Sequence, residues 1–215
     1  PKGFIEFNGQ SIVERSIYLL LKNGIEKIII GTGYLSKYYE RLENKNNIIC
    51  VKNDMFNNTG SLFTLLNLKN YISDDFFLME SDIINKEKVL KILKNDLNKN
   101  VIAASEITNH GDEVYIEANN NISLKNLSKD KDQLSNTYGE LVGISKLSYD
   151  TFKKMCLKYK SDNKNIKKHD YEDGIVKICK SEKIYISKIK NLIWSEIDTI
   201  EQFQNCKVNI FPKLI

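Results

Sequence analysis

The sequence lacks the cysteine pattern of a zinc site or of a disulfide framework. Its four cysteines, Cys50, Cys156, Cys179 and Cys206, lie far apart, and no two of them have the spacing of a metal-binding pair. No apolar run approaches the length of a membrane span, and no signal peptide opens the chain. We therefore expect a soluble protein of a reducing compartment, the cytoplasm, without a membrane span.

The charged residues form no stripe of one sign. The chain has 32 basic and 28 acidic residues, a formal net charge of +4, and its lysines are scattered through Asn-rich segments. A nucleic-acid-binding surface needs clustered basic residues, so nucleic acid is not expected as a partner. The two histidines, His110 and His169, lie in polar stretches without ligand spacing, and we interpret both as exposed bystanders.

A single large domain over residues 1–215 fits the 41% hydrophobic content, which is enough for one full core. The chain begins with Pro-Lys-Gly-Phe and runs almost at once into a predicted helix at 11–23, which Ser11 and Glu14 start as a capping box and Gly24 ends. An α/β domain usually begins with a strand. We therefore expect that the first strand and the loop after it are missing from this sequence.

Strands and helices alternate through the first half of the chain, which predicts an α/β fold with a mixed, mostly parallel sheet. The predicted strands are 25–31, 47–52, 76–82 and 101–106, and the predicted helices are 36–42, 61–68 and 86–97. Strands at 113–117, 122–127 and 140–145 then follow one another without helices, which predicts an antiparallel insertion at about 107–147. Two helices at 150–160 and 171–181, a surface loop at 160–168, a strand at 184–189 and a helix at 200–209 complete the prediction.

The stretch from Phe76 to Asn85, FFLMESDIIN, combines an apolar run with acidic residues. Four large apolar residues without alternation are typical of a strand buried on both faces, and this one ends in Glu80, Ser81 and Asp82. Ligands of open α/β sheets bind at the carboxyl ends of strands, so Asp82 is a candidate for contact with a metal or a substrate. The alternative is that Asp82 caps the following helix, and Glu80 is interpreted as support.

The stretch WSEIDT, residues 194–199, is a second candidate. Glu196 and Asp198 are two positions apart, so in an extended chain they share a face with Trp194. If Asp198 converges with Asp82, the pair offers carboxylate oxygens to Mg²⁺. Alternatively, Asp198 and Thr199 cap the last helix, and Trp194 is a core residue.

Taken in order, the motifs of the chain resemble the small cytidylyltransferases that act on choline phosphate and on 2-aminoethylphosphonate. The motifs are Pro1-Lys2-Gly3, Gly31-Thr32-Gly33-Tyr34, NNTGS at 57–61, Glu80-Ser81-Asp82, Tyr138-Gly139-Glu140 and WSEIDT. The blocks VKNDMFNNTGS, GDEVYIE, YGELVGISKL and WSEIDT are most similar to 2-aminoethylphosphonate cytidylyltransferases, including those joined to an aminoethylphosphonate transaminase. Such a transaminase is therefore an expected fused or separate partner.

The resemblance implies a Rossmann-like three-layer α/β/α nucleotidyltransferase fold and transfer of CMP from CTP to 2-aminoethylphosphonate, with release of pyrophosphate, in phosphonate biosynthesis. Asp82 and Asp198 would hold Mg²⁺, and Lys2 would be catalytic as a point charge at the α-phosphate or the incoming phosphonate. Without the resemblance, Lys2 would be interpreted as an exposed lysine near the end of the chain. Phosphoryl transfer needs positioning and charge neutralisation, so the absence of a nucleophilic Ser/His/Asp set is no objection.

The resemblance also implies two groups of ligand-binding residues. CTP would be bound by Thr32, Gly33, Tyr34, Asn58, Thr59, Gly60 and Ser61. The acceptor would be bound by Lys129, Tyr138, Glu140, Glu172, Asp173, Trp194 and Glu196, of which the acids and aromatic rings suit an ammonium group. For the CTP group the alternative is plain loop structure. Glu172 and Asp173 could instead complement a helix dipole, and Lys129 could belong to a charged turn.

Two alternatives for the function stay open. A choline-phosphate cytidylyltransferase would surround a quaternary ammonium with aromatic walls, whereas a primary ammonium favours the acids found here. A noncatalytic nucleotide-binding module is suggested by the missing Gly-rich phosphate loop. The sequence predicts no oligomeric state.

Overall fold

The computed structural model describes residues 1–43, 47–160 and 168–214, so most of the predicted surface loop at 160–168 lies outside the described residues. The chain divides into two compact units that alternate along the sequence. Unit 1 comprises Pro1–Ile25, Phe77–Lys146 and Ile184–Ile215, and unit 2 comprises Glu26–Phe76 and Leu147–Lys183. The single domain over residues 1–215 stays a prediction. In the part of the chain that the structure covers, no helix is long and apolar enough to cross a membrane.

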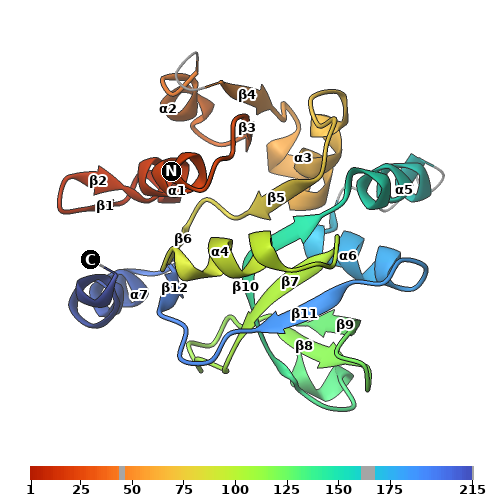
Figure 1. The fold of residues 1–215 in the computed structure, drawn as a ribbon. Helices are drawn as coiled ribbons and strands as arrows, with labels where there is room; N and C mark the ends of the chain where they lie inside the picture. The colour runs from red at the N-terminus through yellow and green to blue at the C-terminus, as the bar shows by residue number, and fades with distance from the viewer. Residues whose placement is uncertain (44–46, 161–167, 215) are drawn as a thin grey trace. The chain divides into compact units, whose positions relative to one another are not determined.

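A sheet of six strands forms the centre of unit 1 (Figure 1). Its order is β11 (Tyr185–Lys188), β7 (Val101–Ser105), β10 (Gly139–Leu147), β8 (Tyr115–Ala118) and β9 (Leu124–Ser128), and β5 (Phe76–Met79) also pairs with β10. Strands β7 and β11 are parallel, whereas β10 is antiparallel to β7 and β8, and β8 to β9. The antiparallel strands predicted in this region are therefore present, and their interpretation as an insertion stays a prediction.

Two amphipathic helices, α1 (Ile12–Lys22) and α4 (Lys88–Asn95), contribute to the core of unit 1. The capping box of Ser11 and Glu14 is present as predicted, and Gly24 follows the helix with a φ of +78°. The core joins Leu19 of α1 and the apolar face of α4 to β7, β10 and Trp194. Each fully buried aliphatic side chain there contributes about 1.5–3 kcal/mol, so the core holds the strands that carry the acidic residues.

The two ends of the chain pack together in unit 1. The short hairpin of β1 (Glu6–Phe7) and β2 (Gln10–Ser11) follows a 3-10 turn at Lys2–Phe4. The ring of Phe7 stacks on Phe211 at 5.0 Å and lies 5.5 Å from Phe203 of α7 (Ile200–Asn205). A π-helix, Cys206–Ile210, and a 3-10 turn, Phe211–Lys213, continue from α7. This packing places the first residues of the chain beside the last helix.

Unit 2 contains the parallel pair β3 (Ile28–Thr32) and β4 (Ile48–Lys52) and the helices α2 (Ser36–Glu40), α3 (Ser61–Asn67), α5 (Tyr149–Lys160) and α6 (Tyr171–Cys179). Helix α3 packs closely on its neighbours where glycine removes a side chain. A Cβ on Gly31 would lie 2.7 Å from Thr64 Cγ2, and a Cβ on Gly174 would lie 2.7 Å from Leu62 Cδ1. Strand β3, helix α3 and helix α6 therefore form one packed group.

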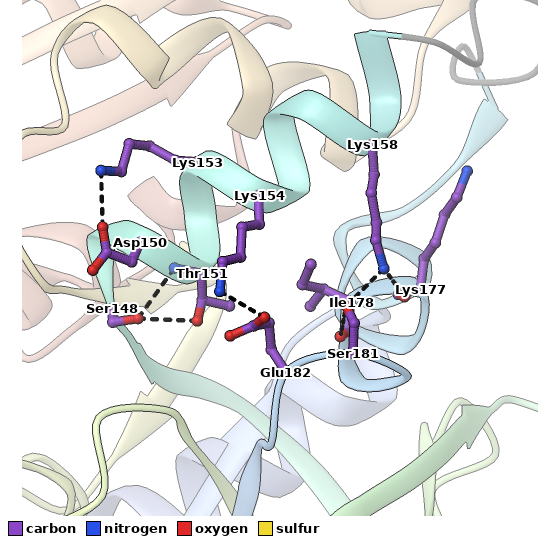
Figure 2. A network of polar contacts seen from close by, with 10 residues as sticks. All are labelled: Ser148, Asp150, Thr151, Lys153, Lys154, Lys158, Lys177, Ile178, Ser181 and Glu182. Carbon is purple, nitrogen blue, oxygen red and sulfur yellow. Dashed lines mark hydrogen bonds and ion pairs between the residues drawn. The ribbon is translucent and has the colours of Figure 1, made fainter.

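Lysine side chains join α5 to the end of α6, as Figure 2 shows. Lys154 Nζ lies 2.7 Å from Glu182 Oε1, and Lys158 Nζ lies 2.7 Å from Ser181 Oγ. Lys158 also donates to the carbonyl oxygen of Lys177 at 3.4 Å, so it complements the negative end of the α6 dipole. These lysines connect two helices of unit 2.

The strand predicted at 76–82 is divided in the structure. Strand β5 ends at Met79 and β6 (Ile83–Asn85) follows, so Asp82 lies in the turn between them. The predicted burial of residues 76–79 on both faces was wrong, because all four are half-buried. Strand β5 pairs with β10, and among the described residues no strand pairs with its other edge. Strand β6 instead pairs with β12 (Trp194–Glu196) in an antiparallel ribbon.

Candidate active site

Three carboxylates of unit 1 converge at the ends of β6 and β12. Asp82, Glu196 and Asp198 each place one oxygen within 4.8 Å of the others. The antiparallel ribbon causes this, since it sets Glu196 opposite Ile83 and the amide of Ile197 donates to the carbonyl oxygen of Asp82 at 3.2 Å. The convergence on which the predicted metal role of Asp82 and Asp198 depends is therefore present, and Glu196 joins it.

The ammonium of Lys2 lies between two of these carboxylates. It forms an ion pair and hydrogen bond with Asp198, and its Nζ lies 3.4 Å from Asp82 Oδ2. Burial acts to lower the pKa of Lys2, but the hydrogen bond to Asp198 and the charge of Asp82 raise the pKa overall. Lys2 is therefore a permanent cation in the cluster.

Negative charge exceeds positive charge in this cluster. Burial raises the pKa of Asp82, although Lys2 opposes that effect. Burial, together with the charges of Asp198 and Asp82, raises the pKa of Glu196 to about 7. Crowded carboxylates of this kind are stabilised by a divalent cation, and carboxylate oxygens are the ligands that Mg²⁺ takes. The residues present therefore fit the predicted ion, with Asp82, Asp198 and Glu196 as available ligands.

Gln202 fixes the turn that carries Asp198. Its Oε1 accepts hydrogen bonds from the backbone amides of Asp198, at 2.5 Å, and Thr199, at 3.0 Å. Its Nε2 donates to Asp112 Oδ2 at 2.5 Å. Sequence reasoning missed Gln202. The pattern Thr199-x-x-Gln202 signals a capping box, but no sequence signal points to Asp112, 90 residues away.

Glu140, a predicted acceptor residue, binds the loop at residues 106–114. Its side chain is only 4% exposed, and it accepts from the Thr108 amide at 2.6 Å and the Thr108 hydroxyl at 3.1 Å. Burial raises the pKa of Glu140 to about 7, and the charges of Glu113 and Asp112 add to the effect. Glu113, which the sequence analysis did not single out, organises the same loop through the amides of His110 and Gly111 and the Tyr115 hydroxyl.

The other predicted acceptor residues of unit 1 lie in different surroundings. Lys129 is exposed. The ammonium of Lys188 lies over the ring of Tyr138, 5.1 Å from the ring centre. Trp194 is only 5% exposed and belongs to the core of unit 1, which favours the alternative that it is a core residue. Glu80 packs against the backbone of Gly143, where a Cβ would lie 2.1 Å from Glu80 Oε2, and this agrees with a supporting role.

In unit 2, the two predicted CTP loops are joined by Asn53, which the sequence analysis missed. Asn53 is buried, and its Nδ2 donates to Thr59 Oγ1 at 2.8 Å and to Thr64 Oγ1 at 3.0 Å. Its backbone amide donates to the carbonyl oxygen of Thr32 at 2.8 Å. Thr32 Oγ1 is buried with no hydrogen-bond partner among the described residues.

Glycine allows close contact in both of these loops. A Cβ on Gly33 would lie 2.6 Å from Phe56 Cβ, and one on Gly60 would lie 2.2 Å from the carbonyl oxygen of His169. Tyr34 follows Gly33 and is exposed. Its ring centre lies 6.4 Å from the ring centre of Phe56. Asn58 ends a 3-10 turn in the second loop. The two glycines therefore allow the loops of unit 2 to pack closely against Phe56 and His169.

The second loop is also attached to the start of α6. Ser61 Oγ donates to Asp170 Oδ1 at 3.1 Å and accepts from the Tyr171 amide at 2.9 Å. Asp173 accepts from the Asp170 amide at 2.9 Å in a capping box, so one of its oxygens already serves the helix start, and Glu172 is half-buried. His169 Nδ1 lies 3.1 Å from Asp173 Oδ2, a local contact that does not test the interpretation of His169 as a bystander.

Comparison with known proteins gives partial sequence matches. No family model matches the chain. A choline-phosphate cytidylyltransferase of Streptococcus pneumoniae is 25% identical over 99 residues, which cover 46% of this chain and 42% of the relative. One of Haemophilus influenzae is 22% identical over 85 residues, which cover 40% of this chain and 36% of the relative. The chain thus spans less than half the length of these curated relatives.

Solved structures match over almost the whole chain. A CTP:phosphocholine cytidylyltransferase of Streptococcus pneumoniae has a TM-score of 0.80 at 18% identity and covers 96% of this chain and 88% of its own. An inositol-1-phosphate CTP transferase of T. maritima has a TM-score of 0.78 at 18% identity, with coverage of 94% and 82%. The chain therefore has the predicted α/β nucleotidyltransferase fold.

Proposed function

We propose that this chain transfers CMP from CTP to 2-aminoethylphosphonate, giving CMP-2-aminoethylphosphonate and pyrophosphate. The observation that carries the proposal is the convergence of Lys2 with Asp82, Glu196 and Asp198 in a nucleotidyltransferase fold. Relatives and structural neighbours named as cytidylyltransferases support the class of reaction. The same-order sequence motifs support the acceptor.

The residues of the cluster suit this reaction. Asp82 and Asp198 would hold Mg²⁺, whose charge neutralises the phosphate oxygens. Lys2 would bind the α-phosphate or the incoming phosphonate as a point charge. A phosphonate oxygen forms a bond to the α-phosphorus, the bond from the α-phosphorus to the bridging oxygen breaks, and pyrophosphate leaves. No nucleophilic side chain is needed.

A primary ammonium suits the acidic side chains better than a quaternary one does. Glu196 lies in the carboxylate cluster and can accept a hydrogen bond from an ammonium N–H, which a quaternary ammonium lacks. The indole of Trp194 is buried in the core, so it provides no aromatic wall. Choline phosphate is the second candidate, because both curated relatives described above are named for it.

A noncatalytic nucleotide-binding module is the alternative of another class. The site in unit 2, with a buried Thr32 hydroxyl and the Asn53 connection, could bind a nucleotide without any chemistry. Such a module would bind CTP equally well without the carboxylates of unit 1. A role in phosphonate biosynthesis, a cytoplasmic location and a transaminase partner stay predictions.

Pyrophosphate release by the full-length protein tests the proposal. The assay contains CTP and Mg²⁺ with 2-aminoethylphosphonate or phosphocholine, and compares the wild type with D82N and with D150N, which removes an exposed carboxylate of unit 2 as a control. We expect faster turnover with 2-aminoethylphosphonate, loss of turnover in D82N and normal turnover in D150N. Faster turnover with phosphocholine would establish the second candidate. CTP binding without turnover would establish the noncatalytic module.

A further inference from the structure

Gln202 connects two segments of unit 1 that carry acidic residues. One segment is the turn after β12, where Asp198 and Thr199 donate their amides to Gln202 Oε1. The other is the loop at 106–114, where Asp112 accepts from Gln202 Nε2. A capping box uses only the side-chain oxygen of Gln202, because that oxygen accepts hydrogen bonds from the backbone. The donor half, directed to Asp112, is therefore unexplained by capping.

The loop at 106–114 is held by charged hydrogen bonds at three points. Thr108 is bound by Glu140, the amides of His110 and Gly111 are bound by Glu113, and Asp112 is bound by Gln202. Glu140 and Glu113 are both buried; Glu140 belongs to β10, whereas Glu113 belongs to the loop itself. The hydrogen bond from Gln202 connects this loop to the turn that carries Asp198.

We propose that Gln202 is a positioning residue that holds the Asp198 turn and the loop at 106–114 together as one wall of the acceptor site. This inference rests on the proposed function. A single amide serves both segments, so a shift of the loop moves the amide away from the turn that carries Asp198. The acceptor's ammonium would meet this wall.

The proposal is tested by exchanging the amide of Gln202 and the carboxylate of Asp112. Q202E keeps the acceptor oxygens of the helix cap but replaces the N–H donor by a second carboxylate facing Asp112. D112N keeps an acceptor for Gln202, and the double variant Q202E/D112N restores a donor and an acceptor in reversed order. Q204E adds the same charge at an exposed position of α7 and serves as the matched control.

Two quantities are measured in the full-length protein: the KM for 2-aminoethylphosphonate and the amide hydrogen exchange of residues 106–114. We expect Q202E to raise the KM about tenfold and to accelerate exchange in the loop, which corresponds to a lost charged hydrogen bond. Q204E should stay within twofold of the wild type in both measurements. D112N should leave exchange in the loop near the wild type, because its side-chain amide oxygen still accepts from Gln202, and the double variant should also restore exchange to near the wild type.

Other outcomes overturn the proposal. If Q202E behaves like Q204E in both measurements, Gln202 acts only as a helix cap. If Q202E and D112N shift the KM in opposite directions by equal factors, net charge and not the bridge decides acceptor binding. Hydrogen exchange needs no turnover, so a protein without cytidylyltransferase activity would refute the proposed function while the exchange result still decides the bridge.

Discussion

At the level of single residues, a few charged side chains share a small volume in unit 1. Lys2 neutralises part of a cluster in which burial and like charges raise the pKa of Asp82 and of Glu196. The sequence predicted Lys2, Asp82 and Asp198, because each stands in a motif. It could not predict Glu113, Asn53 or Gln202, whose roles depend on partners distant in sequence or on loop geometry.

The substitution K2M should strengthen the binding of a divalent cation in the absence of nucleotide. The ammonium of Lys2 contacts Asp82 and Asp198, so it repels a second cation that uses the same oxygens. We expect about a tenfold lower Kd for Mn²⁺ by titration calorimetry, which corresponds to about 1.4 kcal/mol of relieved repulsion. K207M, at an exposed position, is the control. A weaker affinity in K2M would show that Lys2 helps to build the cation site.

Glu140 should make the stability of the protein depend on pH. The pKa of about 7 in the folded state lies above the ordinary 4.5, so between these values the folded protein holds a proton that the unfolded chain has released. The free energy of unfolding therefore falls as the pH rises through this window and stays lower above it. In E140Q, urea unfolding should show a decrease between pH 5 and pH 8 that is smaller by about 2 kcal/mol. Equal decreases in both proteins would contradict this account.

At the scale of the element, strong local signals placed most helices and strands correctly. The capping box of α1, the glycine after it and the run of strands without an α-helix from Val101 to Leu147 were all readable, because they follow from local geometry. The division of the strand at 76–82 into β5 and β6 was not readable. It depends on the pairing of β6 with β12, which lie more than 100 residues apart.

Gly60 should be essential for the attachment of the NNTGS loop to α6. An added Cβ would lie 2.2 Å from the carbonyl oxygen of His169, and backbone yields less readily than a side chain. We expect G60A to lower the free energy of unfolding by about 2 kcal/mol, as overpacking does in cores, and to weaken CTP binding at least tenfold. Urea unfolding and calorimetry would measure both. Unchanged CTP affinity in a destabilised G60A would remove this loop from the nucleotide site.

At the scale of the whole molecule, two interleaved units each carry part of the proposed chemistry. Unit 1 holds the carboxylates with Lys2, and unit 2 holds the Thr32 and NNTGS loops. The order of motifs along the chain predicted the fold, because spacing in a nucleotidyltransferase follows from its strand order. Choice of acceptor is harder to predict, since ammonium groups of different substitution are distinguished by side-chain contacts that no motif specifies.

Direct observation of the product tests whether the protein transfers CMP to 2-aminoethylphosphonate. The full-length protein is mixed with CTP, Mg²⁺ and 2-aminoethylphosphonate and followed by phosphorus NMR. The account predicts loss of the free phosphonate signal, a new phosphonate signal coupled to the α-phosphorus of CMP, and one pyrophosphate for each phosphonate consumed. An unchanged phosphonate signal while CTP stays intact, or while CTP is hydrolysed, would contradict it.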